Sequence, residues 1–506
     1  MVVGAVASPL LAAIDSNTDD DCHHGHRRHD QLVADLQHRV LEMADGSRCF
    51  DQLRRFAEMR VLAGRIDQRT AFAATNNRTG EYGVNKMAIA ADTAGAADAI
   101  EPSPSDTSLR GLDGVNLLLA GALSGFGPYV AVFLADQNWT QRDIGFVLTA
   151  AGFAGLLSQI PGGELLDAIR SKRFVVALGA AMVAAGALII ALWPSFPLVL
   201  VALVLQGITG GFLGLAIAAI SLGLVGNAAL GERLGRNQRF ASTGGVVAAG
   251  LMGLIAYFLS YRAIFFVAAA LVLPLLAALG RIHPSDIHFG RASCLPDHQG
   301  PSTPQRARRR RLWKNRGLLT FAGGVFLFQM ANASMLPLAG EALAYSKEAI
   351  SSLIVSALIM VPQVIVALMA PWVGRQANTW GRRPLLLVGF AALPIRALVF
   401  ASTTNPMILI AAQVLDGVSG TMLGVLTALI VADLTVGTGR FNLAQGFVGT
   451  MSGVGASLST TLSGLVAASL GRAAGFLGIA TLALAAVLLV WSLMPETNPS
   501  NKNEIR

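Results

Sequence analysis

The sequence predicts an all-α membrane protein with twelve transmembrane helices, arranged as two pseudo-symmetric halves of six helices each. Three observations predict this fold class. Apolar residues make up 53% of the 506 residues and charged residues only 13%, whereas a soluble domain carries about 25% charged residues. From residue 115 onward the chain contains a series of apolar runs long enough to cross a bilayer. Two segments of this apolar part also repeat at a common spacing.

The charged residues are distributed unevenly along the chain. Residues 1–110 hold 28 of them with a net charge of −4, and the following 396 residues hold only 40 with a net charge of +12. We therefore expect residues 1–110 to be a polar, partly disordered N-terminal extension. Met87 stands far enough ahead of the first apolar run to be an alternative start of the chain, so the extension is either a small appendage or a misassigned start.

The composition excludes several classes of protein. Cys22, Cys49 and Cys294 form no C-x-x-C motif, so neither a disulfide framework nor a zinc site is expected. The histidines of residues 23–29 lie in a polar tract that is typical of a solvated segment. The sequence contains no P-loop, no H-E-x-x-H and no G-x-S-x-G motif. We expect no enzyme activity, no metal, no cofactor and no nucleic-acid partner.

Twelve apolar runs of about 20 residues each predict the spans. They are 115–134, 145–166, 174–193, 197–225, 241–260, 263–280, 318–339, 350–371, 384–401, 406–433, 443–469 and 473–493. The expected organisation is therefore an extension (1–110), a first half (111–280), a basic cytoplasmic connector (281–316), a second half (317–495) and a C-terminal tail (496–506).

The positions of Lys and Arg predict the orientation of the spans. If residue 114 is cytoplasmic, the inward loops and the tail hold 21 of these cations and the outward loops hold 4. Cytoplasmic loops of membrane proteins carry the excess of positive charge. The sequence therefore predicts that both termini and the connector are cytoplasmic, in an inner membrane, with the connector's basic run at anionic lipid headgroups.

The two halves repeat in sequence. Residues 204–214 and 414–424 are identical at six of eleven positions, at an offset of 210. The segments that begin at Pro161 and Pro371 correspond at nearly the same offset. Two parallel six-helix halves joined by a long connector are typical of transporters that bind their substrate near the midplane, between the halves.

The segment after the second span of each half resembles a known motif, G-x-x-x-D-[RK]-x-G-[RK]-[RK], of the major facilitator superfamily. The matching positions are Gly163, Asp167, Lys172 and Arg173 in the first half, and Gly374, Asn378, Gly381, Arg382 and Arg383 in the second. Arg170 replaces the second glycine of the first copy, and Asn378 replaces the carboxylate of the second. The resemblance covers about residues 115–493 and identifies no substrate.

The resemblance implies that these loops are gates. In the family the carboxylate of the motif helps to lock the cytoplasmic gate near the eleventh span, so Asp167 is expected to approach the helix that starts near Phe441. Residues of the motif also have a simpler explanation: the cations at the start of the third and ninth spans are expected to hold the loops at anionic headgroups.

Polar residues deep in a span are costly unless they face protein or water, so each is a functional candidate. The resemblance implies that spans 1, 4, 7 and 10 line the pathway. There the candidates for the substrate cavity are Gln206, Thr209, Gln329, Asn332 and Gln413, and the candidate for proton coupling is Asp416. With only apolar and amide neighbours, the Asp416 carboxyl is expected to resist ionisation, as a proton carrier would. A structural, hydrogen-bonding role is the alternative for all six. Arg396, in the ninth span, is expected to snorkel outward.

Together these features predict a secondary active transporter, or permease, that moves a small organic solute by alternating access. Proton coupling is expected, export is slightly favoured over uptake, and the protein is expected to be a monomer in the bilayer. The alternative is a membrane sensor or scaffold that keeps the fold without transporting.

Overall fold

The computed structural model describes residues 104–498, except for residues 125, 127, 293, 295–311 and 345–350. These residues belong to one compact unit, Pro102–Arg506. Residues 1–103 lie outside the described residues. The expectations for that part of the N-terminal extension therefore stay predictions. Nearly all regular structure in the described part is α-helical.

The helices of the first half follow the expected spans closely. They are α5 (Asp106–Ser124), α6 (Pro128–Asp136), α7 (Gln141–Ala168), α8 (Lys172–Leu192), α9 (Phe196–Phe258), α10 (Tyr261–Ala270) and α11 (Val272–Gly280). The first span is thus divided between α5 and α6, and the sixth between α10 and α11. Helix α5 begins at Asp106, ahead of the expected boundary at residue 110.

The connector contributes the short 3₁₀ helix η1 (Pro284–Asp286) and α12 (Phe289–Ala292). The second half follows as α14 (Arg316–Asn332), α15 (Met335–Ala344), α16 (Ser351–Thr379), α17 (Arg382–Ser402), α18 (Pro406–Thr435), α19 (Phe441–Leu470) and α20 (Arg472–Leu493). Polar side chains define several helix starts. Thr140 accepts a hydrogen bond from the Asp143 N–H at the start of α7, and Asn405 accepts one from the Met407 N–H at the start of α18.

Eleven helices in the described part are long and apolar enough to cross a membrane, against twelve expected spans. The difference lies in α9, whose 63 residues join the fourth and fifth spans. At 1.5 Å per residue such a helix would be about 95 Å long, roughly three times the hydrocarbon thickness. It is interrupted at Gly226, whose φ of 66° and ψ of 179° are not helical. The two arms on either side of Gly226 correspond to two spans.

Replacing Gly226 by Ala is expected to destabilise the protein by about 1–3 kcal/mol, because this region of φ and ψ is nearly exclusive to glycine. The nearest atom to an added Cβ is the Arg291 Cδ at 3.9 Å, so the cost is one of backbone conformation rather than crowding. Thermal unfolding in detergent would measure it. Gly250→Ala is the matched control, since Gly250 lies in the same helix with open space around it. Equal stability of the two variants would contradict this account of the kink.

The buried apolar side chains form two clusters, one within the first half and one centred on the second half that also takes in part of α9. One cluster of buried side chains includes Leu112, Val183 and Phe265 of the first half, and the other includes Phe328, Phe390 and Phe476 of the second half. Large apolar side chains are also exposed along the outer faces of the helices. Examples are Phe174, Leu254, Leu368 and Trp491. Such a surface suits lipid rather than water as its solvent.

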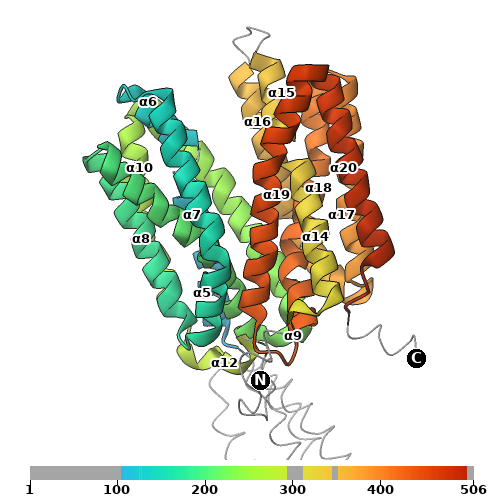
Figure 1. The fold of residues 1–506 in the computed structure, drawn as a ribbon. Helices are drawn as coiled ribbons and strands as arrows, with labels where there is room; N and C mark the ends of the chain where they lie inside the picture. Colours follow the sequence, from blue (N-terminus) through green and yellow to red (C-terminus); the bar gives the residue numbers. More distant parts are fainter. Residues whose placement is uncertain are drawn as a thin grey trace, which may run out of the picture. The chain divides into compact units, whose positions relative to one another are not determined.

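The two halves meet mainly through four helices. Helix α7 packs on α19, and α16 packs on α9. In Figure 1 the first half (blue to green) and the second half (yellow to red) approach one another at the end that carries α12 and diverge towards α6 and α15. We call the end with α12 the connector end.

Candidate functional site

The carboxylate of Asp167 joins the two halves at the connector end. It lies at the end of α7, and its two oxygens accept hydrogen bonds from the backbone N–H groups of Asn442 (3.1 Å) and Leu443 (3.0 Å), the first residues of α19. The Asn442 Nδ2 donates a further bond at 2.8 Å. The first N–H groups of a helix have no partner within the helix, and its dipole favours an anion there. Asp167 therefore caps α19 from the opposite half, at the start of the helix that the family resemblance implied for it.

Lys172, in the loop between α7 and α8, does not face lipid headgroups as expected. Lys172 is only 1% exposed, and its Nζ donates hydrogen bonds to the carbonyl oxygens of Leu166 and Ile169. The prediction that Lys172 holds the loop at headgroups is wrong, because the ammonium group closes the turn between α7 and α8 from inside. Glu164 supplies the loop's second link across the halves, since its carboxylate lies 3.7 Å from Arg440.

The second gating loop is built in the same way from different residues. Arg382 is 3% exposed, and its Nε donates to the Asp433 Oδ2 at 3.1 Å, so it too is not a headgroup anchor. Glu496 accepts hydrogen bonds from the backbone N–H groups of Arg382 and Arg383. The Asn378 Nδ2 donates to the Ala228 carbonyl oxygen at 3.1 Å, which links α16 to α9 of the other half. Gly381, with a φ of 91°, forms the turn between α16 and α17.

Glycines allow the helices of the two halves to touch backbone to backbone. A Cβ at Gly163 would overlap the Asn442 carbonyl oxygen, and one at Gly374 would overlap that of Gly231. A Cβ at Gly446 or at Gly235 would likewise overlap a carbonyl oxygen of the facing helix. Gly374 follows Gly163 by 211 positions, and Gly446 follows Gly235 by the same interval. The α7–α19 contact and the α9–α16 contact are therefore equivalent under the internal repeat.

The connector runs beneath this contact. The carbonyl oxygen of Cys294 accepts a hydrogen bond from the Gly439 N–H at 3.2 Å, and the His288 N–H donates to Gly223 of α9 at 3.1 Å. Burial raises the pKa of the Cys294 thiol to about 12. Asp286 accepts hydrogen bonds from Ser105 and Ser108, which lower the pKa of its carboxyl. The described part of the connector thus bonds to both halves.

A buried charge pair that the sequence did not indicate lies in the first half. Asp113 of α5 accepts hydrogen bonds from Arg233 (2.5 Å) and Arg236 (2.6 Å) of α9. Arg233 is 4% exposed and also donates to the Asn237 Oδ1 at 2.8 Å. Both arginines were expected to be loop cations that mark the cytoplasmic side. They lie within α9 instead, because its second arm begins directly after Gly226.

The expectation for Arg396 is wrong. Its side chain is 2% exposed and lies inside the second half, where its Nη1 donates to the Asp416 carboxylate and, at 2.9 Å, to the Asn332 Oδ1. Asp416 therefore has a guanidinium partner rather than only apolar and amide neighbours. A buried arginine requires a counter-charge, which explains why it points inward instead of snorkelling. The guanidinium of this pair is buried, whereas the side chain of Asp416 remains 24% exposed and keeps partial contact with solvent.

The other candidates for the substrate cavity occupy different environments. Thr209 is fully buried and donates to the Leu205 carbonyl oxygen in its own helix (2.8 Å). The Gln413 Nε2 donates to the Leu358 carbonyl oxygen at 2.7 Å, which ties α18 to α16. Gln206 and Gln329 are partly buried. The structure thus brings Asn332 and Asp416 together through Arg396 but does not gather all six candidates around one space.

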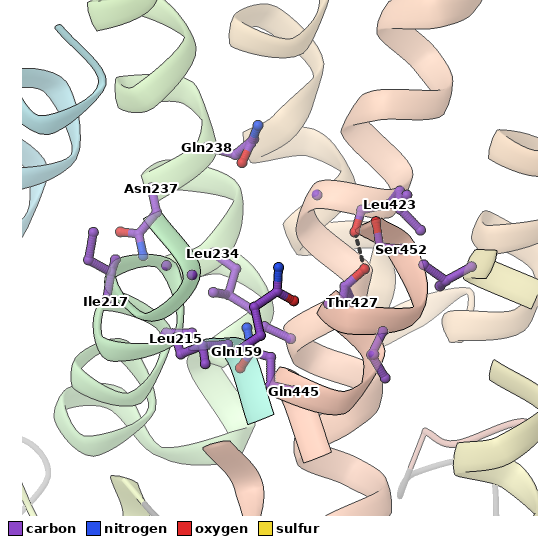
Figure 2. Close-up of a pocket in the computed structure, with 18 of the residues that line it drawn as sticks. Gln159, Leu215, Ile217, Leu234, Asn237, Gln238, Leu423, Thr427, Gln445 and Ser452 are labelled. Carbon is purple, nitrogen blue, oxygen red and sulfur yellow. Dashed lines mark hydrogen bonds between the residues drawn. The ribbon is translucent and has the colours of Figure 1, made fainter. Parts of the chain in front are cut away.

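A cavity of about 400 Å³ lies between the halves. Its described lining comes from α5, α7 and α9 of the first half and from α14, α18 and α19 of the second, as the close-up in Figure 2 shows in part. The polar residues of the lining are Asn116, Gln159, Asn237, Gln238, Thr427, Gln445 and Ser452. None of the described lining residues is Asp, Glu, Lys, Arg or His, and none is one of the six candidates.

None of these polar cavity residues was predicted, although each lies within an expected apolar run or beside one. The expectation that only four spans face the pathway excluded Gln159 of α7 and Gln445 of α19. Asn116 stands two residues into the first expected span, where it was indistinguishable from an interfacial residue. The assignment of Gln206, Thr209, Gln329, Asn332 and Gln413 to the substrate pathway stays a prediction.

An all-helical fold, a repeated inter-half contact and a shared polar cavity define a two-half membrane transport protein. The model of the Major Facilitator Superfamily matches residues 113–367 and 321–506, and the chain belongs to this superfamily. Membership confirms the expected family, the multi-pass membrane location and the expectation that the chain is a transporter rather than an enzyme.

Two curated relatives are 37% identical to the chain over 393 residues, which are 78% of this chain and 94% of each relative. They are the uncharacterized MFS-type transporters MT2531 and Rv2456c of two Mycobacterium tuberculosis strains, CDC 1551 / Oshkosh and ATCC 25618 / H37Rv. Neither name specifies a substrate.

Among solved structures, the proton:xylose symporter XylE matches with a TM-score of 0.60 at 14% identity, covering 77% of this chain and 95% of its own. The transporter FucP in its outward conformation also matches with a TM-score of 0.60, at 15% identity, covering 76% of this chain and 97% of its own. At such identities the likeness is one of fold, and it confirms the predicted fold class.

Proposed function

We propose that the protein is a proton-coupled secondary transporter that moves a small organic solute by alternating access. The observation that carries this proposal is a cavity shared by both halves, bordered by helices that also form the contact at the connector end. Gln159 and Gln445 line the cavity, and Gly163 and Asn442, farther along the same two helices, form that contact. A solute in the cavity would therefore be released when this contact opens.

The conformation supports alternating access in a specific way. The Asp167 cap on α19, the Glu164–Arg440 pair and the glycine contacts all join the halves at the connector end. With the proposed orientation, in which the connector is cytoplasmic, this is a state closed towards the cytoplasm. Opening it would break one carboxylate cap and two sets of close backbone contacts, which sets a barrier between two discrete states.

Asp416 is the proposed site of proton coupling. The carboxylate of Asp416 pairs with the buried Arg396 and retains contact with solvent. Ionised, it neutralises Arg396. Protonated, it releases the arginine to other partners, of which Asn332 is already within hydrogen-bond distance. Such an exchange of partners would let proton binding bias the conformation of the second half.

The test of transport is solute flux into proteoliposomes that contain the full chain, with an imposed proton gradient. Accumulation that an uncoupler abolishes is expected. Saturable solute binding without any flux, in either direction, would instead identify a non-transporting sensor with this fold.

The proposed orientation predicts the result of reporter fusions. Reporters placed after Glu496 or within residues 281–316 should be active on the cytoplasmic side, and one within residues 135–143 on the opposite side. The reason is the 21-to-4 distribution of Lys and Arg between the two sets of loops. An external signal from residues 281–316 would overturn the orientation.

A further inference from the structure

Seven of the twenty described residues that line the cavity between the halves are polar and uncharged, and the others are apolar or glycine. Amide and hydroxyl side chains come to it from both halves, and the described lining contains no titratable residue. An ionised solute that entered the cavity would lose its water and find no opposite charge to replace it. That transfer is unfavourable unless the charge is paired.

Arg233, which bonds to the cavity residue Asn237, is already engaged by other groups. Arg233 directs its Nε to the Asn237 Oδ1, its Nη1 to the Leu109 carbonyl oxygen and its Nη2 to Asp113. Asn237 lines the cavity, but its Nδ2 donates to the Ser221 hydroxyl at 2.7 Å, so both ends of this amide are occupied. The guanidinium is thus held behind Asn237 and is not free to receive an anion.

Two other amides of the lining lack partners. The Oε1 atoms of Gln159 and Gln445 are buried and accept no hydrogen bond from any described residue. Leaving such an oxygen unpaired is costly, so buried polar groups generally have a partner. Gln159 belongs to α7 and Gln445 to α19, and both are labelled in Figure 2.

The two amides also lie at the contact between the halves. The Oε1 of Gln159 rests where a Cβ of Gly449 would be, one helical turn beyond Gln445 on α19. A Gln side chain offers two N–H donors and one acceptor oxygen, so after rotation of the side chains the pair could both donate to and accept from a hydroxyl or amide group. A solute that bonds to Gln159 and Gln445 together would bridge the first half and the second.

We infer that the transported solute is uncharged and rich in hydroxyl or amide groups, and that Gln159 and Gln445 bind it from opposite halves. This inference rests on the proposed function, because it names the class of substrate for the same cavity. A volume of about 400 Å³ corresponds to roughly 13 water molecules. The cavity therefore fits a compact solute with a similar number of non-hydrogen atoms. The charged pair of Arg396 and Asp416 is not part of the described lining, which separates coupling from recognition.

The test compares uncharged solutes with charged analogues of the same skeleton. Proteoliposomes of the full wild-type chain would be assayed for saturable uptake and counterflow of D-glucose and uridine. The charged analogues are D-gluconate, D-glucosamine and uridine monophosphate. Saturable transport of at least one uncharged solute is expected, with its charged analogues excluded by at least tenfold.

Two variants test the named residues. Gln159→Leu and Gln445→Leu should each weaken binding of the transported solute by about tenfold, the usual effect of losing a buried hydrogen bond. Gln141→Leu is the matched control, because Gln141 lies in the same helix as Gln159 but is exposed at its other end, and it should leave transport unchanged. Gln159→Glu and Gln445→Glu keep the side-chain size and add a negative charge. They should shift preference towards D-glucosamine, a change that a merely structural glutamine would not produce.

Three results would overturn the inference. Transport of a charged analogue with exclusion of its uncharged parent would reject the substrate class while leaving the proposed transporter intact. Normal uptake by both Leu variants would reject the two glutamines. Failure to transport any of the uncharged solutes would reject the proposed substrate class. A stability-shift screen of charged solutes, followed by flux assays, would then test separately whether the protein is a transporter. If the Leu variants do not fold, the comparison of solutes in the wild type still tests the substrate class, and the Glu variants still test the two glutamines.

Discussion

Asp416→Asn is expected to abolish gradient-driven accumulation of solute and to lower the stability of the protein by about 3 kcal/mol. The stability loss follows from Arg396, which is 2% exposed and directs its Nη1 to the Asp416 carboxylate. Removing one member of a buried ion pair leaves the other charge uncompensated, which costs several kcal/mol. The transport loss follows from the proposed coupling, because an amide does not titrate.

The measurements separate these two effects. Thermal unfolding in detergent reports stability, whereas proteoliposomes report gradient-driven uptake and, separately, exchange without a gradient. Exchange is expected to survive in Asp416→Asn, since it does not require return of an empty, deprotonated carrier. The double variant Asp416→Asn with Arg396→Gln removes both charges and should recover most of the stability, while gradient-driven uptake stays absent.

Asp136→Asn is the matched control, because Asp136 is exposed at the end of α6 and should tolerate the same change. Undiminished accumulation by Asp416→Asn would eliminate Asp416 as an essential proton site. Recovery of gradient-driven uptake in the charge-free double variant would show that the pair serves only structure.

Gly163→Ala is expected to reduce transport by at least tenfold by preventing closure at the connector end. The added Cβ would overlap the Asn442 carbonyl oxygen, which belongs to helix backbone and not to a side chain that can rotate away. Overpacking of this kind costs about 1–3 kcal/mol. Here the cost falls only on the closed state, because in the open state α7 and α19 would be apart. The equilibrium between the two states should therefore shift towards the open one.

Cys294 offers a direct measure of this shift. It is 7% exposed at the connector end, and a thiol with a pKa of about 12 is nearly all protonated at neutral pH and alkylates slowly. In a chain that carries Cys22→Ser and Cys49→Ser, labelling by iodoacetamide reports Cys294 alone. We expect Gly163→Ala to accelerate that labelling several-fold. By the internal repeat, Gly374→Ala should do the same, since its Cβ would meet the Gly231 carbonyl oxygen.

Gly145→Ala is the control for the helix itself. Gly145 lies in α7 with no atom within 4 Å of an added Cβ, so this variant changes helix propensity without touching α19. Normal transport and slow Cys294 labelling are expected. If Gly163→Ala transports normally, close approach of α7 and α19 is not required for the transport cycle.

In the proposed transport cycle, gating and recognition would share helices. Gln159 and Gly163 stand one helical turn apart on α7, and Gln445 stands close to Asn442 on α19. A solute held between the two glutamines would therefore lie directly above the backbone contact that must open for its release. This arrangement links occupancy of the cavity to the gate without any separate transmitting element.

Features that depend on the average hydropathy of a segment could be predicted from the amino-acid sequence alone. Apolar length predicted the spans, and the structure departs from them only where a kinked helix joins two spans at Gly226 and where short helices divide others. The approach of Asp167 to the helix that begins at Phe441 was implied by the resemblance of the motif to the family, because local composition does not relate residues 275 positions apart.

Only the tertiary structure decided which polar groups meet. Arg396 and Asp416 are 20 positions apart, and Asp113 and Arg233 are 120 apart, so each pairing depends on how packed helices are rotated about their axes. The mean hydropathy of a segment does not depend on that rotation. The sequence around an arginine in an apolar run is therefore the same whether its side chain points outward or inward. The cavity also depends on how the helices are rotated and packed. Gln159 and Gln445 line the same cavity because glycines let α7 and α19 approach closely.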